Sequence, residues 1–107
     1  MTINDNTIEI LKALADTTRF KILELLSTSG NNLCVTAISN KLEISQPVVS
    51  QHLKILKNAR IVSADRQGYH IHYSINHDTL SGLMEQISKL LEINAHKCTK
   101  DTCIIKT

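Results

Sequence analysis

Apolar residues recur at helical spacing through the first half of the chain. Ile8, Leu11 and Ala15 share one predicted helical face, and Ile10 and Leu14 flank it. The residue types and their order therefore predict a first helix that packs against the rest of a domain.

A second helix is predicted directly after Asp16, whose side chain suits the N-cap position. Its apolar residues cover a wide arc, as is typical of a helix at the centre of a core. They are Phe20, Ile22, Leu23, Leu25 and Leu26. The polar run from Ser27 to Asn32 then predicts a loop, with Gly30 or an asparagine in the left-handed conformation.

Two further helices follow with only a few residues between them. Val35, Ile38 and Leu42 share a helical face. Ser45 suits the N-cap of the next helix, and Pro47 is tolerated in its first turn. This order predicts a helix-turn-helix over about 35–58.

The helix over 46–58 is expected to have two distinct faces. Val49, Leu53 and Leu56 fall on one side, with Ile55 nearby. The other side carries mostly small polar and amide side chains, namely Ser45, Gln46, Ser50, Gln51 and Lys54. Such side chains bond base edges or phosphates, so this face suits a DNA major groove.

After Arg60 the apolar period changes from that of a helix to that of a strand. The alternating residues are Tyr69, Ile71, Tyr73 and Ile75, with His70, His72 and Ser74 between them. Ile61 and Val62 are assigned to the partner strand, and Gly68 to the turn. The pattern therefore predicts a hairpin, or wing, over about 60–75.

A last helix is predicted over about 78–95, and its stripe is longer than a small core needs. The stripe consists of Leu80, Leu83, Met84, Ile87, Leu90, Leu91 and Asn94. Together with the first helix it predicts a dimer interface. The expected fold is mainly α with a small β-hairpin: one winged helix-turn-helix domain over 1–107, homodimeric, ending in a cysteine-containing tail over 96–107.

The distribution of charge agrees with this interpretation, although the formal net charge is only +2. Four cations lie around the helix-turn-helix, against the single acid Glu43: Lys41, Lys54, Lys57 and Arg60. No apolar run is long enough to span a membrane, and the first 16 residues lack a signal-peptide pattern. We therefore expect a cytoplasmic protein with no membrane partner.

Two segments carry a resemblance to a known family. LKALADTTRFKIL (11–23) resembles the opening signature of the ArsR/SmtB metalloregulators, and SQPVVSQHLKIL (45–56) resembles their recognition helix. The resemblance extends over about residues 8–93, with Thr17 where proline is usual. It implies a homodimeric repressor that leaves its operator when an inducer binds, the inducer being a metal or metalloid in many members and thiol oxidation or persulfide formation in others.

The resemblance also implies where DNA is contacted. The residues expected to contact DNA lie on the recognition helix and the wing: Ser45, Gln46, Val48, Ser50, Gln51, His52, Lys54, Lys57 and Arg66. For His52, a phosphate contact and a packing role both remain open. The wing histidines His70 and His72 have a spacing that suits a metal, but we favour solvated residues near DNA.

One family metal site lies at the start of the helix before the turn. Cys34 matches its first thiol, but Thr36 replaces the second thiol and Ala37 stands in place of an acid. That site is therefore incomplete.

A second family site lies on the last helix and joins both subunits of the dimer. The matching positions here are His77, Thr79, Leu90 and Ile93. Because leucine and isoleucine cannot ligate a metal, a zinc or cobalt site of that type is not expected.

The remaining candidates for an inducer site are the cysteine thiols. Cys98 and Cys103 in the tail, with Cys34, suit arsenite, cadmium, lead or cuprous copper. The alternative is a redox switch in which Cys98 and Cys103 form a disulfide and no cofactor is needed. Core packing of Cys34 and a tail without function are the simpler interpretations.

Three classes of function follow from these observations. The first is a repressor of double-stranded operator DNA whose inducer acts on thiols, and it is favoured by the helix pattern. The second is a winged helix that binds a protein partner. The third, an enzyme, is disfavoured because no paired carboxylates, nucleophile–base pair or phosphate loop is present.

Overall fold

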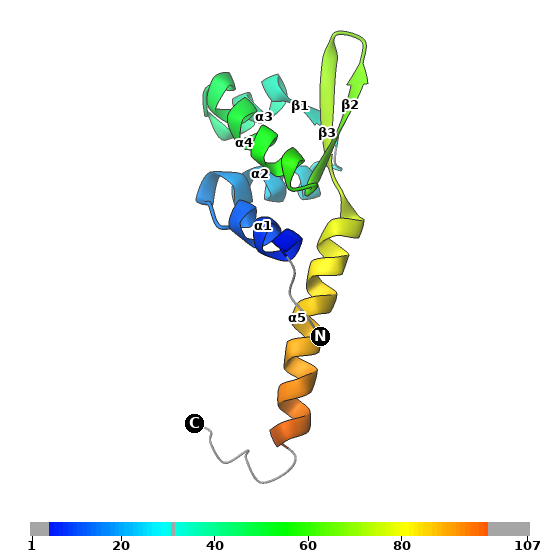
Figure 1. Ribbon diagram of the computed structural model, residues 1–107. Helices are drawn as coiled ribbons and strands as arrows, with labels where there is room; N and C mark the ends of the chain where they lie inside the picture. The colour runs from blue at the N-terminus through cyan, green and yellow to red at the C-terminus, as the bar shows by residue number, and fades with distance from the viewer. Residues whose placement is uncertain (1–4, 31, 99–107) are drawn as a thin grey trace.

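The computed structural model describes residues 5–30 and 32–98 (Figure 1). The helices are α1 (Asp5–Leu14), α2 (Thr17–Thr28), α3 (Val35–Leu42), α4 (Gln46–Asn58) and α5 (His77–Cys98). The strands are β1 (Leu33–Cys34), β2 (Val62–Gln67) and β3 (His70–Ile75). Within the described residues, no helix is long and apolar enough to cross a membrane.

The core is built mainly from α2, α3, α4 and the residues that lead into β2. Its largest fully buried side chains are Ile22, Leu26, Ile38, Val49, Leu53, Leu56 and Ile61. The expected cap of α2 is confirmed, because the Asp16 carboxylate accepts a hydrogen bond from the backbone N–H of Arg19 at 3.0 Å. This bond pairs one of the N–H groups that a helix start leaves without an intrahelical partner.

The buried face of α1 differs from the prediction. Ile10 and Ala13 are buried, whereas Ile8 and Leu11 are exposed. The expected burial of α2 is also only partly right, because the Phe20 side chain is 55% exposed. Periodicity finds an apolar face but does not say whether that face meets the core of its own chain.

The wing belongs to a sheet of three antiparallel strands in the order β1-β3-β2. The sequence predicted only two of them. The third strand, β1, pairs Leu33 with Tyr73 and Cys34 with His72. It thereby joins the wing to the start of α3.

The turn of the hairpin is formed by Gly68 and Tyr69, which follow β2 and precede β3. Gly68 has a φ of 66°, a conformation that glycine adopts without steric cost. Tyr69 was expected to be a half-buried strand residue, but it is 98% exposed at the tip. The predicted strand therefore begins one residue before β3, because the turn itself carries an aromatic residue.

Helix α5 runs away from the body of the domain (Figure 1). Leu83 is buried and Leu80 packs against the core, but most of the stripe beyond them is exposed, namely Met84, Ile87, Leu90 and Leu91. The helix continues to Cys98, beyond the expected end near 95. Cys98 therefore lies on the helix, while Cys103 lies outside the described residues.

Candidate nucleic-acid interface

The turn between α3 and α4 is held by the residues at its two ends. Glu43 adopts the left-handed conformation with a φ of 56°, and its N–H donates to the Ser39 carbonyl. The N–H of Ile44 donates to the same carbonyl at 3.2 Å. The buried Ser39 hydroxyl in turn donates to the Ile44 carbonyl, so the turn has its polar groups paired. The angle between α3 and α4 is thus fixed locally.

Helix α4 has the two faces that the sequence predicted. Val49, Leu53 and Leu56 are fully buried. The polar residues predicted for the other face are exposed, namely Ser45, Gln46, Ser50, Gln51 and Lys54, as are Val48 and Lys57. At 100° per residue, Gln51 and Lys54 lie nearly opposite the buried stripe. An exposed face rich in amides and hydroxyls can enter a major groove when the opposite face of the helix is packed in the core.

The start of α4 differs from the prediction in one detail. Ser45 occupies the N-cap position with extended backbone, but its side chain makes no capping hydrogen bond. Gln46 instead directs its amide to Thr36 on α3, with 3.4 Å between Nε2 and Oγ1. Ser45 is exposed.

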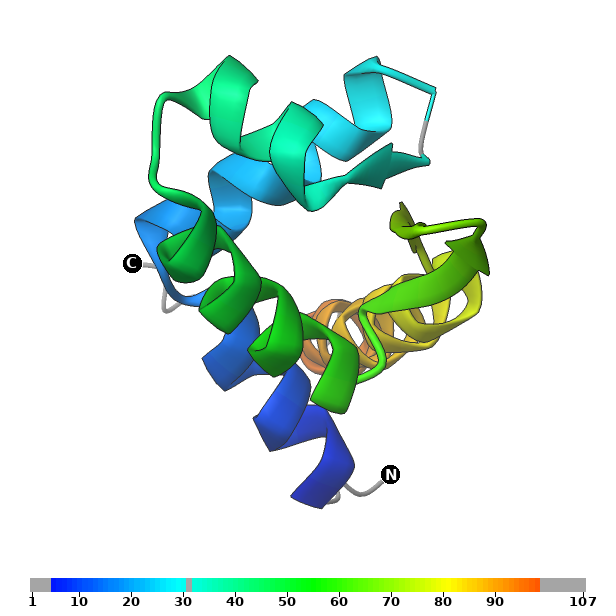
Figure 2. The ribbon, with the colours of Figure 1, turned by 90° about the horizontal axis from the view of Figure 1, so that it is seen from above.

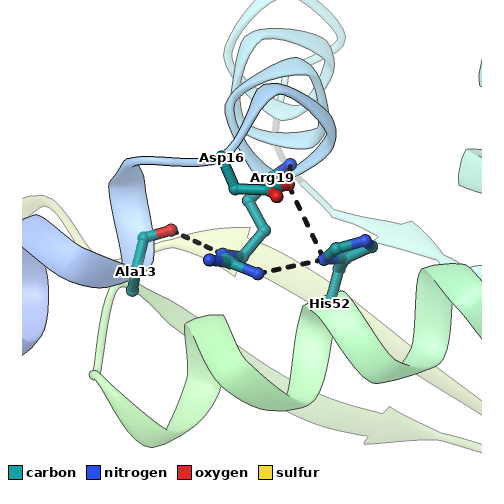
Figure 3. Close-up of polar contacts among 4 residues, drawn as sticks. All are labelled: Ala13, Asp16, Arg19 and His52. Carbon is teal, nitrogen blue, oxygen red and sulfur yellow. Dashed lines mark hydrogen bonds and ion pairs between the residues drawn. The ribbon is translucent and has the colours of Figure 1, made fainter.

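His52 lies on a flank of α4 that faces the corner between α1 and α2 (Figure 3). Its Nδ1 is 3.2 Å from Nη1 of Arg19 and 3.9 Å from Oδ2 of Asp16. The hydrogen bond from the Arg19 N–H, followed by the positive charge of Arg19, lowers the pKa of Asp16 below its ordinary value of 3.8. The packing role that the sequence left open for His52 is therefore present. Its predicted DNA contact stays a prediction.

The wing presents polar side chains around its tip. Arg66 is exposed and its Nη1 lies 3.4 Å from the Gly68 carbonyl. Tyr69 lies at the same tip, and the sequence analysis missed it as a candidate DNA contact because its alternation suggested burial. The signal available in the sequence was an aromatic residue directly after the turn glycine Gly68.

Exposed cations surround these elements: Lys41, Lys54, Lys57, Arg60 and Arg66. Figure 2 looks down on this end of the molecule and shows α3, α4 and the hairpin, with α5 running away beneath. The surface that carries the candidate DNA contacts is thus separate from the far end of α5 (Figure 1).

The structure brings Cys34 close to the wing but not into a metal cluster. Cys34 is a free, half-buried thiol, opposite His72 in the sheet, and Asp65 lies opposite His72 on the other side. Nδ1 of His72 is buried without a hydrogen-bond partner. The described part of the chain contains no group of three histidine, cysteine or acidic side chains placed to hold a metal. Any site with three thiolates would therefore need the cysteines of the tail.

The exposed helix face, the turn between α3 and α4 and the three-stranded wing together define a domain of the winged helix-turn-helix class. The family model for bacterial regulatory proteins of the arsR family matches residues 16–64. Two relatives were found over most of their own lengths. The transcriptional repressor SdpR of Bacillus subtilis is 38% identical over 84 residues, covering 75% of this chain and 91% of SdpR. An arsenical resistance operon repressor of Staphylococcus aureus is 30% identical over 89 residues, covering 83% of each chain.

A solved structure agrees with this assignment. A homodimeric winged helix-turn-helix DNA-binding domain of Mycobacterium bovis superposes with a TM-score of 0.67 and 28% identity, covering 87% of this chain and 81% of that one. The protein belongs to the ArsR family of transcriptional regulators. This membership confirms the family expected from residues 11–23 and 45–56, and with it the prediction that the chain is not an enzyme.

Proposed function

We propose that the protein is a transcriptional repressor that binds operator DNA as a homodimer, with α4 of each protomer in a major groove. The observation that carries the proposal is the division of α4 into a fully buried stripe and an exposed polar face. Gln51 and Lys54 on that face supply an amide for base edges and a cation for phosphates. Relatives whose names describe repressors support the direction of control.

The second protomer is expected on the apolar residues that the protomer leaves exposed. On α1 these are Ile8 and Leu11, and on α5 they are Met84, Leu90 and Leu91. A 107-residue domain buries only a limited apolar area by itself. Dimerisation that covers these side chains would add to that buried apolar area and so stabilise the protein. The homodimeric state of the Mycobacterium bovis domain supports the same arrangement.

Hydroxyl-radical footprinting on the promoter of the protein's own gene tests this proposal. A two-fold dimer should protect two half-sites about 34 Å apart, one helical turn of DNA. Protection of a single half-site would contradict the proposed assembly on DNA. Absence of any footprint, with the protein folded, would instead favour a winged helix that binds a protein partner.

The inducer is proposed to act on thiols, as either a thiophilic metal or metalloid or an oxidant. The arsenical resistance repressor of Staphylococcus aureus supports the first, and the pair formed by Cys98 and Cys103 supports the second. Soft thiolates favour arsenite, cadmium, lead and cuprous copper. Cys34 alone has only His72 opposite it among the described strands, so the tail cysteines are required for a three-thiolate site.

Two titrations of the operator complex separate these inducers. Arsenite or cadmium under reductant should release DNA in the first case, and a mild oxidant without metal in the second. Mass spectrometry of the released protein then shows a bound ion or a loss of two hydrogens on disulfide formation. If Cys98→Ser with Cys103→Ser leaves release unchanged under every inducer, both proposals are wrong.

A further inference from the structure

One side chain contacts three helices at the corner between α1, α2 and α4 (Figure 3). Nε of Arg19, on α2, donates to the carbonyl oxygen of Ala13 on α1 at 2.6 Å. Nη1 of the same guanidinium lies 3.2 Å from Nδ1 of His52 on α4. The backbone N–H of Arg19 is held by Asp16, the N-cap of α2. The contact of Nε with Ala13 and the contact of the backbone N–H with Asp16 therefore hold the Arg19 guanidinium in place beside His52.

Each of these contacts has a clear chemical reason. Ala13 lies in the last turn of α1, where carbonyl groups lack an intrahelical partner and a cation is favourable. Because an arginine has donors only, a hydrogen bond between Nη1 and Nδ1 requires Nδ1 of His52 to be the acceptor, which is the tautomer with the ring proton on Nε2. A lysine lacks the planar fork, so it cannot reproduce the separate contacts that Nε makes with Ala13 and Nη1 makes with His52.

His52 is placed to control the orientation of α4. Its ring is 21% exposed, so most of the side chain is packed at the corner. It directly follows Gln51 and precedes Leu53 and Lys54 in the sequence. A rotation of α4 about its axis that breaks the contact with Arg19 therefore also turns the side chains that are proposed to read DNA.

We infer that His52 is a positioning residue for operator binding, acting by accepting the Arg19 hydrogen bond that fixes the rotation of α4 against the corner of α1 and α2. This inference rests on the proposed binding of operator DNA. Because α1 also carries the exposed Ile8 and Leu11, the same guanidinium links the proposed dimer surface to the reading helix. Among the described residues, the charged groups with a contact to the His52 ring are Asp16 and Arg19.

Two amide variants test the contact, because they differ in where they place an acceptor. His52→Asn puts an amide oxygen where Nδ1 lies, so it keeps the Arg19 hydrogen bond. His52→Gln carries its polar atoms one bond further along, near the position of Nε2. Operator affinity measured by fluorescence anisotropy should stay within about threefold of the original protein for His52→Asn, and fall about tenfold or more for His52→Gln.

Arg19→Lys provides a second route to the same contact while keeping the charge. It should also weaken operator binding about tenfold. If His52 acts through Arg19, the double variant with His52→Gln and Arg19→Lys should bind no more weakly than either single variant. Thermal melts of the free proteins, at one concentration, should show that the His52 variants remain folded at the assay temperature.

A direct contact of His52 with phosphate would give a different result. His52→Gln, whose amide nitrogen lies near the position of Nε2, would then keep operator binding, and His52→Asn would weaken it. The inference is overturned if His52→Asn binds operator no more tightly than His52→Gln, or if the losses of the double variant multiply. Failure of the proposed function is distinguishable, because then the unaltered protein would itself bind no operator.

Discussion

Leu53 and Lys54 are adjacent in sequence but are expected to act on two different properties of the protein. Leu53 is fully buried in the cluster that joins α2, α3 and α4, whereas Lys54 is exposed. Replacing a buried leucine by alanine removes its transfer free energy and leaves a cavity, which costs about 2–5 kcal/mol. That is a large part of the roughly 5–15 kcal/mol that stabilises a domain. Lys54→Ala should change stability by less than about 0.5 kcal/mol.

The expected effects on DNA binding are reversed. Each phosphate contact contributes about 0.9 to the salt slope, so Lys54→Ala removes about 1.8 from the slope of a dimer with two copies. Leu53→Ala should leave that slope unchanged under conditions where the protein is folded. Lys89→Ala on α5 is the matched control, since it removes the same charge from an exposed helical site away from α4.

Two assays at one fixed protein concentration measure these effects, because the stability of a dimer depends on concentration. Urea unfolding followed by circular dichroism gives the free energy of unfolding, and anisotropy between about 50 and 200 mM salt gives the slope. A loss below about 1 kcal/mol for Leu53→Ala would refute the assigned core. An unchanged slope for Lys54→Ala, or an equal change for Lys89→Ala, would refute the assigned DNA face.

Other predictions address the wing, the corner and the dimer surface. Gly68→Ala should lower the free energy of unfolding, measured in urea, by about 1 kcal/mol. The cost comes from the left-handed backbone alone, because an added Cβ meets no atom within 4 Å. A much larger loss would contradict this assignment. The pKa of Asp16 is lower in the folded protein, so the stabilisation by its carboxylate is present above the ordinary value of 3.8 and is lost as the pH falls. Between pH 6 and pH 3, the free energy of unfolding should therefore fall less for Asp16→Asn than for the unaltered protein. An equal fall would contradict the assigned cause. Leu91, which is 65% exposed, should be required for dimerisation, so Leu91→Glu should sediment as a folded monomer, and an unchanged dimer would place the interface elsewhere.

Much of the fold could be predicted from the sequence because α3 and α4 carry clean helical stripes. Val49, Leu53 and Leu56 are buried as the spacing predicted. The strand β1 could not be predicted, since two residues have no period and their pairing with β3 is set by the whole fold. The exposure of Phe20 was missed because an apolar arc does not distinguish the core of one chain from a surface that meets another molecule.

The candidate site was predictable in part for the same physical reason. Residues on the outer face of α4 follow directly from the buried stripe, and they are exposed as expected. The contact of His52 with Arg19 joins residues 33 positions apart, so no local pattern reveals it. The position of Tyr69 at the tip of the wing was likewise hidden, because its alternation with His70 and Ile71 looks like a strand.

The exposed face of α4 is proposed to read a specific DNA sequence, and one comparison of affinities tests this directly. Fluorescence anisotropy at about 150 mM salt would compare a duplex from the protein's own promoter with a shuffled duplex of the same composition. Binding to the promoter should be at least about 1,000-fold tighter than binding to the shuffled duplex. Gln51→Ala should reduce this ratio by relaxing discrimination at one base pair in each half-site. Equal affinities for the two duplexes, or a ratio that Gln51→Ala leaves unchanged, would contradict the claim.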